Sequence, residues 1–164
     1  MKEVPIGAKG HFALVVEAEH LANRFKDTTL PAVLATPVMI MVMENAALNA
    51  IKPYLEPGES AVGTRVEISH LAPTPAGLTV FGEAEVTRVN GRRLEFIVRA
   101  TDNVEEIGAG THERVVIELA RLTKRLDAKR LSQLGWRQQR KPLQPKYRQL
   151  ASFRRLPPDA SPIA

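Results

Sequence analysis

The pattern of apolar and polar residues predicts one long, buried helix in the first third of the chain. Residues 35–51 are the most apolar segment, and every position in 38–43 is apolar. A helix that is apolar all round is buried on most of its sides. Thr36 and Pro37 suit the N-cap and the first helical position, and Lys52-Pro53 suits the end of the helix.

After this helix the period of the pattern changes to two, as expected for strands with one buried face. In the segment 62–70, the face predicted to point at the helix carries Val62, Thr64, Val66, Ile68 and His70. Asn90-Gly91 predicts a hairpin turn, and Gly108-Ala109-Gly110 predicts a further turn. The expected strands are residues 11–16 before the helix and residues 62–70, 78–87, 94–100 and 112–119 after it.

This order of elements indicates an α+β fold, in which a curved antiparallel sheet wraps around one long central helix. A single sheet of this kind leaves its edge strands and its outer face exposed. Pairing with a second copy would cover them, so we expect a homodimer, with a tetramer as a further option.

Charge is distributed unevenly along the 164 residues, whose net charge is +5. Residues 1–122 carry 12 Lys and Arg against 16 Asp and Glu, whereas residues 123–164 carry 11 against 2. We therefore predict one domain over 1–122 and a basic appendage over 123–164, with a short helix that ends at Gly135 and then a mostly disordered tail. Nucleic-acid binding is expected, if at all, from this appendage alone, and a solubilising role is an equal alternative.

Composition removes several classes of function. The chain has no cysteine, which excludes disulfides, thiolate-bound zinc, iron–sulfur clusters and a cysteine nucleophile. His11, His20 and His112 lack the spacing of a metal site, so we expect neither a metal nor a cofactor. The sequence has no apolar leader segment and no run of about 18 apolar residues, so we expect no membrane span and a cytoplasmic location.

Glu44 and His70 are the residues whose type and position most suggest chemistry. Glu44 is the first charge inside the apolar helix, and an ionised carboxylate is costly to bury without partners. It therefore lies on a solvent-facing seam or is poised for acid–base or nucleophilic work. His70 is either a core histidine bonded to a carbonyl or a proton carrier. Ordinary roles also exist for Thr36 as an N-cap, for Gly63 in relieving crowding and for Arg114 as a paired strand-edge charge.

Several short motifs add a resemblance to a known family. They are Tyr54-Leu-Glu-Pro-Gly-Glu59, Gly63-Thr64, His70 with Ala72-Pro-Thr-Pro75 and Gly77-Leu-Thr-Val80, Gly91-Arg-Arg-Leu94, and Glu106-Ile-Gly108 through Gly110-Thr-His-Glu-Arg114. Through them, the chain resembles the fluoroacetyl-CoA thioesterase family of hotdog-fold thioesterases. The resemblance implies a hotdog fold and hydrolysis of an acyl-CoA to a free acid and CoA, with CoA as part of the substrate.

The resemblance also implies roles for individual residues. Thr36, Glu44 and His70 fall on the catalytic threonine, glutamate and histidine of the family. Gly63 and Arg114 fall on its glycine and arginine near the reacting group. Glu44 would attack the thioester carbonyl or act as a base on water, and His70 would move protons.

One departure from the family pattern concerns the acyl group. The fluoroacetyl-specific enzyme carries phenylalanines nine and six residues before its threonine, where this chain has Asp27 and Leu30. Leu30 thus stands at a substrate-binding position, but the phenylalanine lid is missing. We expect a thioesterase for a small acyl-CoA. The alternative is a non-catalytic acyl-CoA-binding or regulatory hotdog protein, in which the appendage docks elsewhere. A hotdog hydratase is disfavoured because its aspartate–histidine pair is absent.

Overall fold

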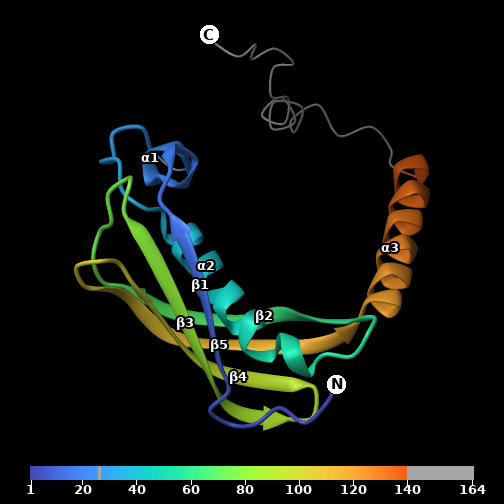
Figure 1. The fold of residues 1–164 in the computed structure, drawn as a ribbon. Helices are drawn as coiled ribbons and strands as arrows, with labels where there is room; N and C mark the ends of the chain where they lie inside the picture. Colours follow the sequence, from blue (N-terminus) through green and yellow to red (C-terminus); the bar gives the residue numbers. More distant parts are fainter. Residues whose placement is uncertain (26, 140–164) are drawn as a thin grey trace. The chain divides into compact units, whose positions relative to one another are not determined.

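A five-stranded antiparallel sheet curves around one long helix (Figure 1). The computed structural model describes residues 1–25 and 27–139. The strands are β1 (Lys9–Val15), β2 (Glu59–His70), β3 (Thr79–Asn90), β4 (Arg93–Thr101) and β5 (Glu106–Glu118). The helices are α1 (Ala22–Phe25), α2 (Thr36–Ile51) and α3 (Leu119–Gln139), with short 3-10 turns η1 (Ala18–His20) and η2 (Lys52–Tyr54).

The strands lie in the order β1-β3-β4-β5-β2, and each neighbouring pair is antiparallel. The predicted α+β class and the strand–helix–four-strand order of the main elements are therefore confirmed. The hairpin at Asn90-Gly91 is also confirmed, because Asn90 pairs with Arg93 and Gly91 has a φ of +58°. The order leaves β1 and β2 as the two edge strands.

The core lies between α2 and the concave face of the sheet. Every turn of α2 contributes buried side chains, among them Met39, Val42 and Met43, and they pack with Phe96 and Val98 of β4. The helix lies mainly over β1 and β3 and makes few contacts with β2. The residues near the β2 edge therefore remain closer to solvent than those at the centre of the sheet.

The turn predicted at Gly108-Ala109-Gly110 is wrong, because these residues lie inside β5. The chain turns earlier, where Asp102 Oδ1 accepts hydrogen bonds from the N–H groups of Val104 and Glu105 at 2.8 and 2.9 Å. The glycines serve close packing instead. A Cβ at Gly108 would lie 2.6 Å from Met39 Sδ. The side chain of Met39 therefore fits against β5 only because residue 108 has no side chain.

The predicted single face of residues 62–70 is also wrong, because β2 contains a bulge. Gly63 pairs with Arg114 of β5, but the next pair is Arg65 with Glu113, so Thr64 is an extra residue. One extra residue reverses the alternation of faces. As a result, Val62 lies on the outer face, whereas the later members Val66, Ile68 and His70 lie on the helix side.

The basic helix predicted beyond Leu122 is longer than expected. The chain divides after Leu122 into two compact units, and α3 continues past Gly135 to Gln139. Glycine inside a helix costs roughly 1 kcal/mol relative to alanine, so it does not always end one. The expected disordered tail falls, from residue 140 onward, outside the described residues. Within the described part of the chain, no helix is both long and apolar enough to cross a membrane.

Candidate functional site

Thr36 and His70 meet where α2 begins and β2 ends. Thr36 Oγ1 lies 2.9 Å from His70 Nδ1 in a hydrogen bond. The predicted N-cap is one residue off: Ala35 occupies that position, and Thr36 is the first residue of the helix and makes no capping bond. The hydroxyl is therefore available to His70. The other ring nitrogen, His70 Nε2, is buried and has no hydrogen-bond partner among the described residues.

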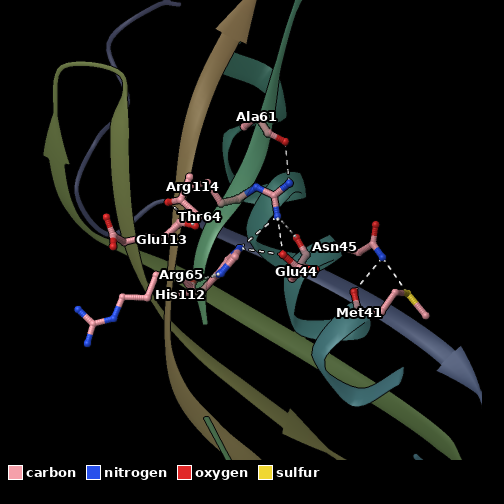
Figure 2. Close-up of polar contacts among 9 residues, drawn as sticks. All are labelled: Met41, Glu44, Asn45, Ala61, Thr64, Arg65, His112, Glu113 and Arg114. Atoms are coloured by element: carbon pink, nitrogen blue, oxygen red, sulfur yellow. Dashed lines mark hydrogen bonds and ion pairs between the residues drawn. The ribbon is translucent and has the colours of Figure 1, made fainter. Parts of the chain in front are cut away.

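Glu44 lies two turns further along α2, in a different group of side chains (Figure 2). Its carboxylate oxygen Oε1 lies 3.6 Å from His112 Nε2 and 3.8 Å from Arg114 Nη1, and its side chain is 37% exposed. Eight residues of helix separate Glu44 from Thr36 by about 12 Å along the axis. Within the described chain, no hydrogen bond or ion pair joins Glu44 to Thr36 or to His70. The three residues thus form two separate groups in one protomer.

Arg114, on β5, anchors the second group to both β2 and α2. Its Nη2 donates to the carbonyl oxygen of Ala61 at 2.7 Å, and its Nη1 donates to the backbone carbonyl of Glu44 at 3.1 Å. The side chain is buried, and this burial lowers the pKa of Arg114, while the charge of Glu44 opposes the shift. The two carbonyl groups fix the orientation of the buried guanidinium. Its positive charge is therefore held facing the carboxylate of Glu44.

His112 completes the second group, although the sequence analysis considered it only as a metal ligand. Its ring is buried, and Nδ1 lies 2.8 Å from the carbonyl oxygen of Arg65. Burial lowers the pKa of His112 and the charge of Arg114 adds to this, whereas the bond to Arg65 and the charges of Glu44 and Glu113 oppose it. The available signal was strand alternation, which places residues 112 and 114 on one face of the same strand.

Gly63 makes room for the carboxylate. A Cβ at this position would lie 2.3 Å from Glu44 Oε1 and 3.0 Å from His112 Cε1. Both approaches are shorter than ordinary van der Waals contact, so any side chain would displace the carboxylate from this location. The family resemblance implied that Gly63 lies near the reacting group, and the structure places Gly63 against the carboxylate of Glu44.

Leu30 and Asp27 lie in the loop that leads into α2. Asp27 Oδ1 accepts the N–H of Thr29 at 2.9 Å, and its backbone carbonyl accepts the N–H of Leu30 at 3.0 Å. The hydrogen bonds from the N–H and the side chain of Thr29 lower the pKa of Asp27. Leu30 is exposed. In the described residues, no three His, Asp or Glu side chains lie together as a metal site would require.

Comparisons with known proteins identify the family of the chain and its fold. Residues 16–120 match the family described as fluoroacetyl-CoA-specific thioesterase. A fluoroacetyl-CoA thioesterase from Streptantibioticus cattleyicolor is 50% identical over 99 residues, which are 60% of this chain and 71% of that protein.

Two solved structures are similar over most of the chain. A fluoroacetyl-CoA thioesterase is 39% identical, with a TM-score of 0.74, over 78% of this chain and 98% of that one. A thioesterase superfamily member from Thermus thermophilus is 32% identical, with a TM-score of 0.73, over 80% of this chain and 99% of that one. The expected hotdog fold is confirmed by these similarities.

Proposed function

Because the chain belongs to the fluoroacetyl-CoA-specific thioesterase family, it is a thioester hydrolase, and we propose that it hydrolyses a small acyl-CoA to a free acid and CoA. The observation that carries the proposal is the placement of Glu44. Its half-exposed carboxylate faces a buried arginine and a buried histidine across the space that Gly63 leaves open. A carboxylate that is fixed and still accessible can attack a carbonyl carbon or take a proton from water.

We propose that a second protomer completes the site, as the expected homodimer would. β2 is an edge strand, and its residues Val62 and Val66 are 39% and 41% exposed. An edge of this length and character favours pairing with another chain. If β2 pairs with its own copy antiparallel and centred near Val66, the extra residue Thr64 shifts the register, and His70 lies opposite Ala61 of the partner subunit, two residues from Gly63 there. Thr36 and His70 of one protomer would then face Glu44 of the other.

In the first of two proposed routes, Glu44 is the nucleophile. Its carboxylate attacks the thioester carbonyl, the C–S bond breaks, and the CoA thiolate takes a proton from His70. Water then hydrolyses the mixed anhydride, which regenerates the carboxylate, and the proton that water releases returns to His70. In the second route, Glu44 removes a proton from a water molecule that attacks the same carbonyl, the C–S bond breaks, and the CoA thiolate takes a proton from His70. In both, the hydroxyl of Thr36 positions His70, and the N–H of Gly63 helps to hold the carbonyl or the water.

The substrate is proposed to be a small acyl-CoA without selection for fluorine. Leu30 and Asp27 occupy the positions of the two phenylalanines of the fluoroacetyl-specific enzyme. An exposed leucine and an aspartate cannot form an aromatic enclosure around a fluorinated acyl group. We therefore expect similar kcat/KM values for acetyl-CoA and fluoroacetyl-CoA.

Thiol release from a panel of acetyl-, fluoroacetyl-, longer and aryl acyl-CoA thioesters tests the proposal. The wild-type protein should release CoA from at least one short acyl-CoA, and Glu44→Gln should bind that thioester and release none. Binding without release by both proteins would favour the non-catalytic alternative and overturn the proposed hydrolysis. A location in the cytoplasm stays a prediction from the sequence.

A further inference from the structure

We propose that His112 is a positioning residue for Glu44, which supports catalysis as a neutral ring and disables Glu44 when it is protonated. This inference rests on the proposed function and assigns a role to a histidine that the Thr36, Glu44 and His70 centre does not include. Figure 2 shows its ring beside both the Arg114 guanidinium and the Glu44 carboxylate, with a dashed line to each. The side chain is 2% exposed, so its partners are the protein groups around it.

The hydrogen bond to Arg65 determines which ring nitrogen carries the proton. A backbone carbonyl can only accept, so His112 Nδ1, 2.8 Å from the Arg65 oxygen, must be the donor. In the neutral ring, Nε2 then has a lone pair and no proton. Arg114 Nη1 lies 3.2 Å from Nε2 and can only donate, so it fills this lone pair.

The neutral ring therefore fixes the guanidinium rather than the carboxylate directly. Arg114 Nη1 is held by His112 Nε2 and by the backbone carbonyl of Glu44, and from there it faces Glu44 Oε1 at 3.8 Å. Since the neutral ring has no proton on Nε2, it offers no hydrogen bond to the Glu44 carboxylate. The carboxylate remains free to attack carbon or to accept a proton.

Protonation of the ring would reverse these relationships. A proton on Nε2 would end the bond from Arg114 and would place a second positive charge beside the guanidinium. The same N–H would point toward Glu44 Oε1, 3.6 Å away, and would hold the carboxylate in an ion pair. A carboxylate in such a pair is a weaker nucleophile and a weaker base.

The surroundings of the ring favour the neutral form. The charged groups near it are Arg114 and Glu113 of β5 and Glu44 of α2, while Arg65 of β2 presents its carbonyl. The ring of Phe96 of β4 lies with its centroid 6.1 Å away. Burial and the charge of Arg114 together outweigh the Arg65 bond and the two carboxylates, and they lower the pKa of His112. A histidine that served packing alone would need the Arg65 bond but no polar groups at Nε2.

Two substitutions separate the functions of the two ring nitrogens. In His112→Gln, the amide oxygen reaches the position of Nε2 and can accept from Arg114, but it cannot be protonated. In His112→Asn, the amide can donate to the Arg65 carbonyl, but nothing accepts from Arg114. We expect His112→Asn to lower kcat about tenfold with little change in KM at every pH, as for one lost hydrogen bond. His112→Gln should lower kcat less.

The pH profile of kcat/KM provides a readout that a packing role would not change. Below the pKa of His112, wild-type activity should fall about tenfold more per pH unit than that of His112→Gln, because one more inactivating proton binds. His70 is the same in both proteins, so its contribution cancels from the comparison. Identical acid limbs in the two folded proteins would overturn the proposal.

Nitrogen NMR of the imidazole rings tests the same proposal without any activity. In wild-type protein at pH 7, we expect His112 to be neutral with its proton on Nδ1, and its signals are identified by their absence in His112→Gln. Glu44→Gln should lower the pKa of His112 further, since the carboxylate charge raises it. A charged ring, or a proton on Nε2 at pH 7, would refute the inference. Absence of thioester hydrolysis with these NMR results intact would refute the proposed function instead.

Discussion

Arg114 donates from Nη1 to the backbone carbonyl of Glu44 at 3.1 Å, and the same Nη1 lies 3.8 Å from the carboxylate oxygen of that residue. The positive charge is therefore tied to the main chain of the residue whose side chain it faces. Nη2 bonds Ala61 of β2 at 2.7 Å. The charge cannot move away from Glu44 unless α2 shifts relative to the sheet edge.

Arg114→Lys should damage both activity and stability. Lysine keeps the charge, but a single ammonium group replaces the planar fork, so the carbonyl of Ala61 or of Glu44 loses its donor. We expect kcat to fall about 100-fold and the free energy of unfolding to fall by about 1–3 kcal/mol. Acyl-CoA hydrolysis and denaturant unfolding measure the two effects.

Arg93→Lys is the matched control for this change. Arg93 forms an ion pair with Glu113 on the outer face of the sheet, where such pairs contribute about 0–1 kcal/mol. Both kcat and stability should stay near the wild-type values. Equal losses in the two variants would show that the contacts of Arg114 are not special.

Gly63→Ala should displace the carboxylate of Glu44. The added Cβ would lie 2.3 Å from Oε1, and a shift of about 1 Å in a reacting group can cost about 100-fold in rate. Gly63 is not one of the described glycines that have a positive φ. Its backbone conformation therefore suits alanine, and the free energy of unfolding should change little. Ser69→Ala, at an exposed position of the same strand, should leave kcat unchanged. Wild-type kcat in Gly63→Ala would contradict the placement of Glu44.

Thr36→Val tests whether the hydroxyl serves His70 or the helix end. Loss of an N-cap typically costs about 1 kcal/mol of stability, but Thr36 makes no capping bond. We therefore expect the midpoint of denaturant unfolding to stay within error, while kcat falls about tenfold or more as the 2.9 Å bond to His70 is lost. A destabilised variant with wild-type kcat would mean that Thr36 is a structural residue.

The ion pairs of Glu59 with Met1 and Arg92 predict that part of the free energy of unfolding is lost in acid. The N-terminal amine of Met1, the N–H of Glu56 and the guanidinium of Arg92 lower the pKa of Glu59 to about 2 from the ordinary 4.5. A carboxyl whose pKa is lowered by folding stabilises the fold above its unfolded pKa, and this contribution is lost as the pH falls toward its folded pKa. The stability difference between wild type and Glu59→Gln should be full above pH 4.5 and should vanish near pH 2. A difference that does not change with pH would contradict this ion pair.

Most of the fold was predictable because its signals are local. The apolar run and the Lys52-Pro53 stop gave α2, which ends at Ile51. Asn90-Gly91 gave the β3–β4 hairpin. The errors arise where the conformation of a segment depends on its contacts with an element far away in the sequence. Gly108 looked like a turn residue, but Met39 of α2 requires a glycine there. The bulge at Thr64 depends on the pairing of β2 with β5, which no local pattern in β2 reveals.

The candidate site was predictable only in part for the same reason. Glu44 is visible as a lone charge in an apolar helix, whereas its neighbour His112 lies 68 positions later in the chain. His70 was expected on the strand face that points at the helix, and the structure places it beside Thr36 at the start of that helix. Glu44 lies about 12 Å further along the helix axis, a separation that the spacing of the residues in the sequence did not reveal for the folded strand. The separation of these two groups is the reason for proposing a second protomer.

Complementation between two inactive variants tests the central claim most directly. Glu44→Gln and His70→Asn are each expected to abolish acyl-CoA hydrolysis. After the two proteins are mixed, unfolded and refolded together, half of the dimers contain one chain of each kind, and one of their two sites is intact. Activity should therefore return to about a quarter of the wild-type value. If each protomer carries a complete site of its own, the mixture will remain inactive, and the composite centre proposed here will be wrong.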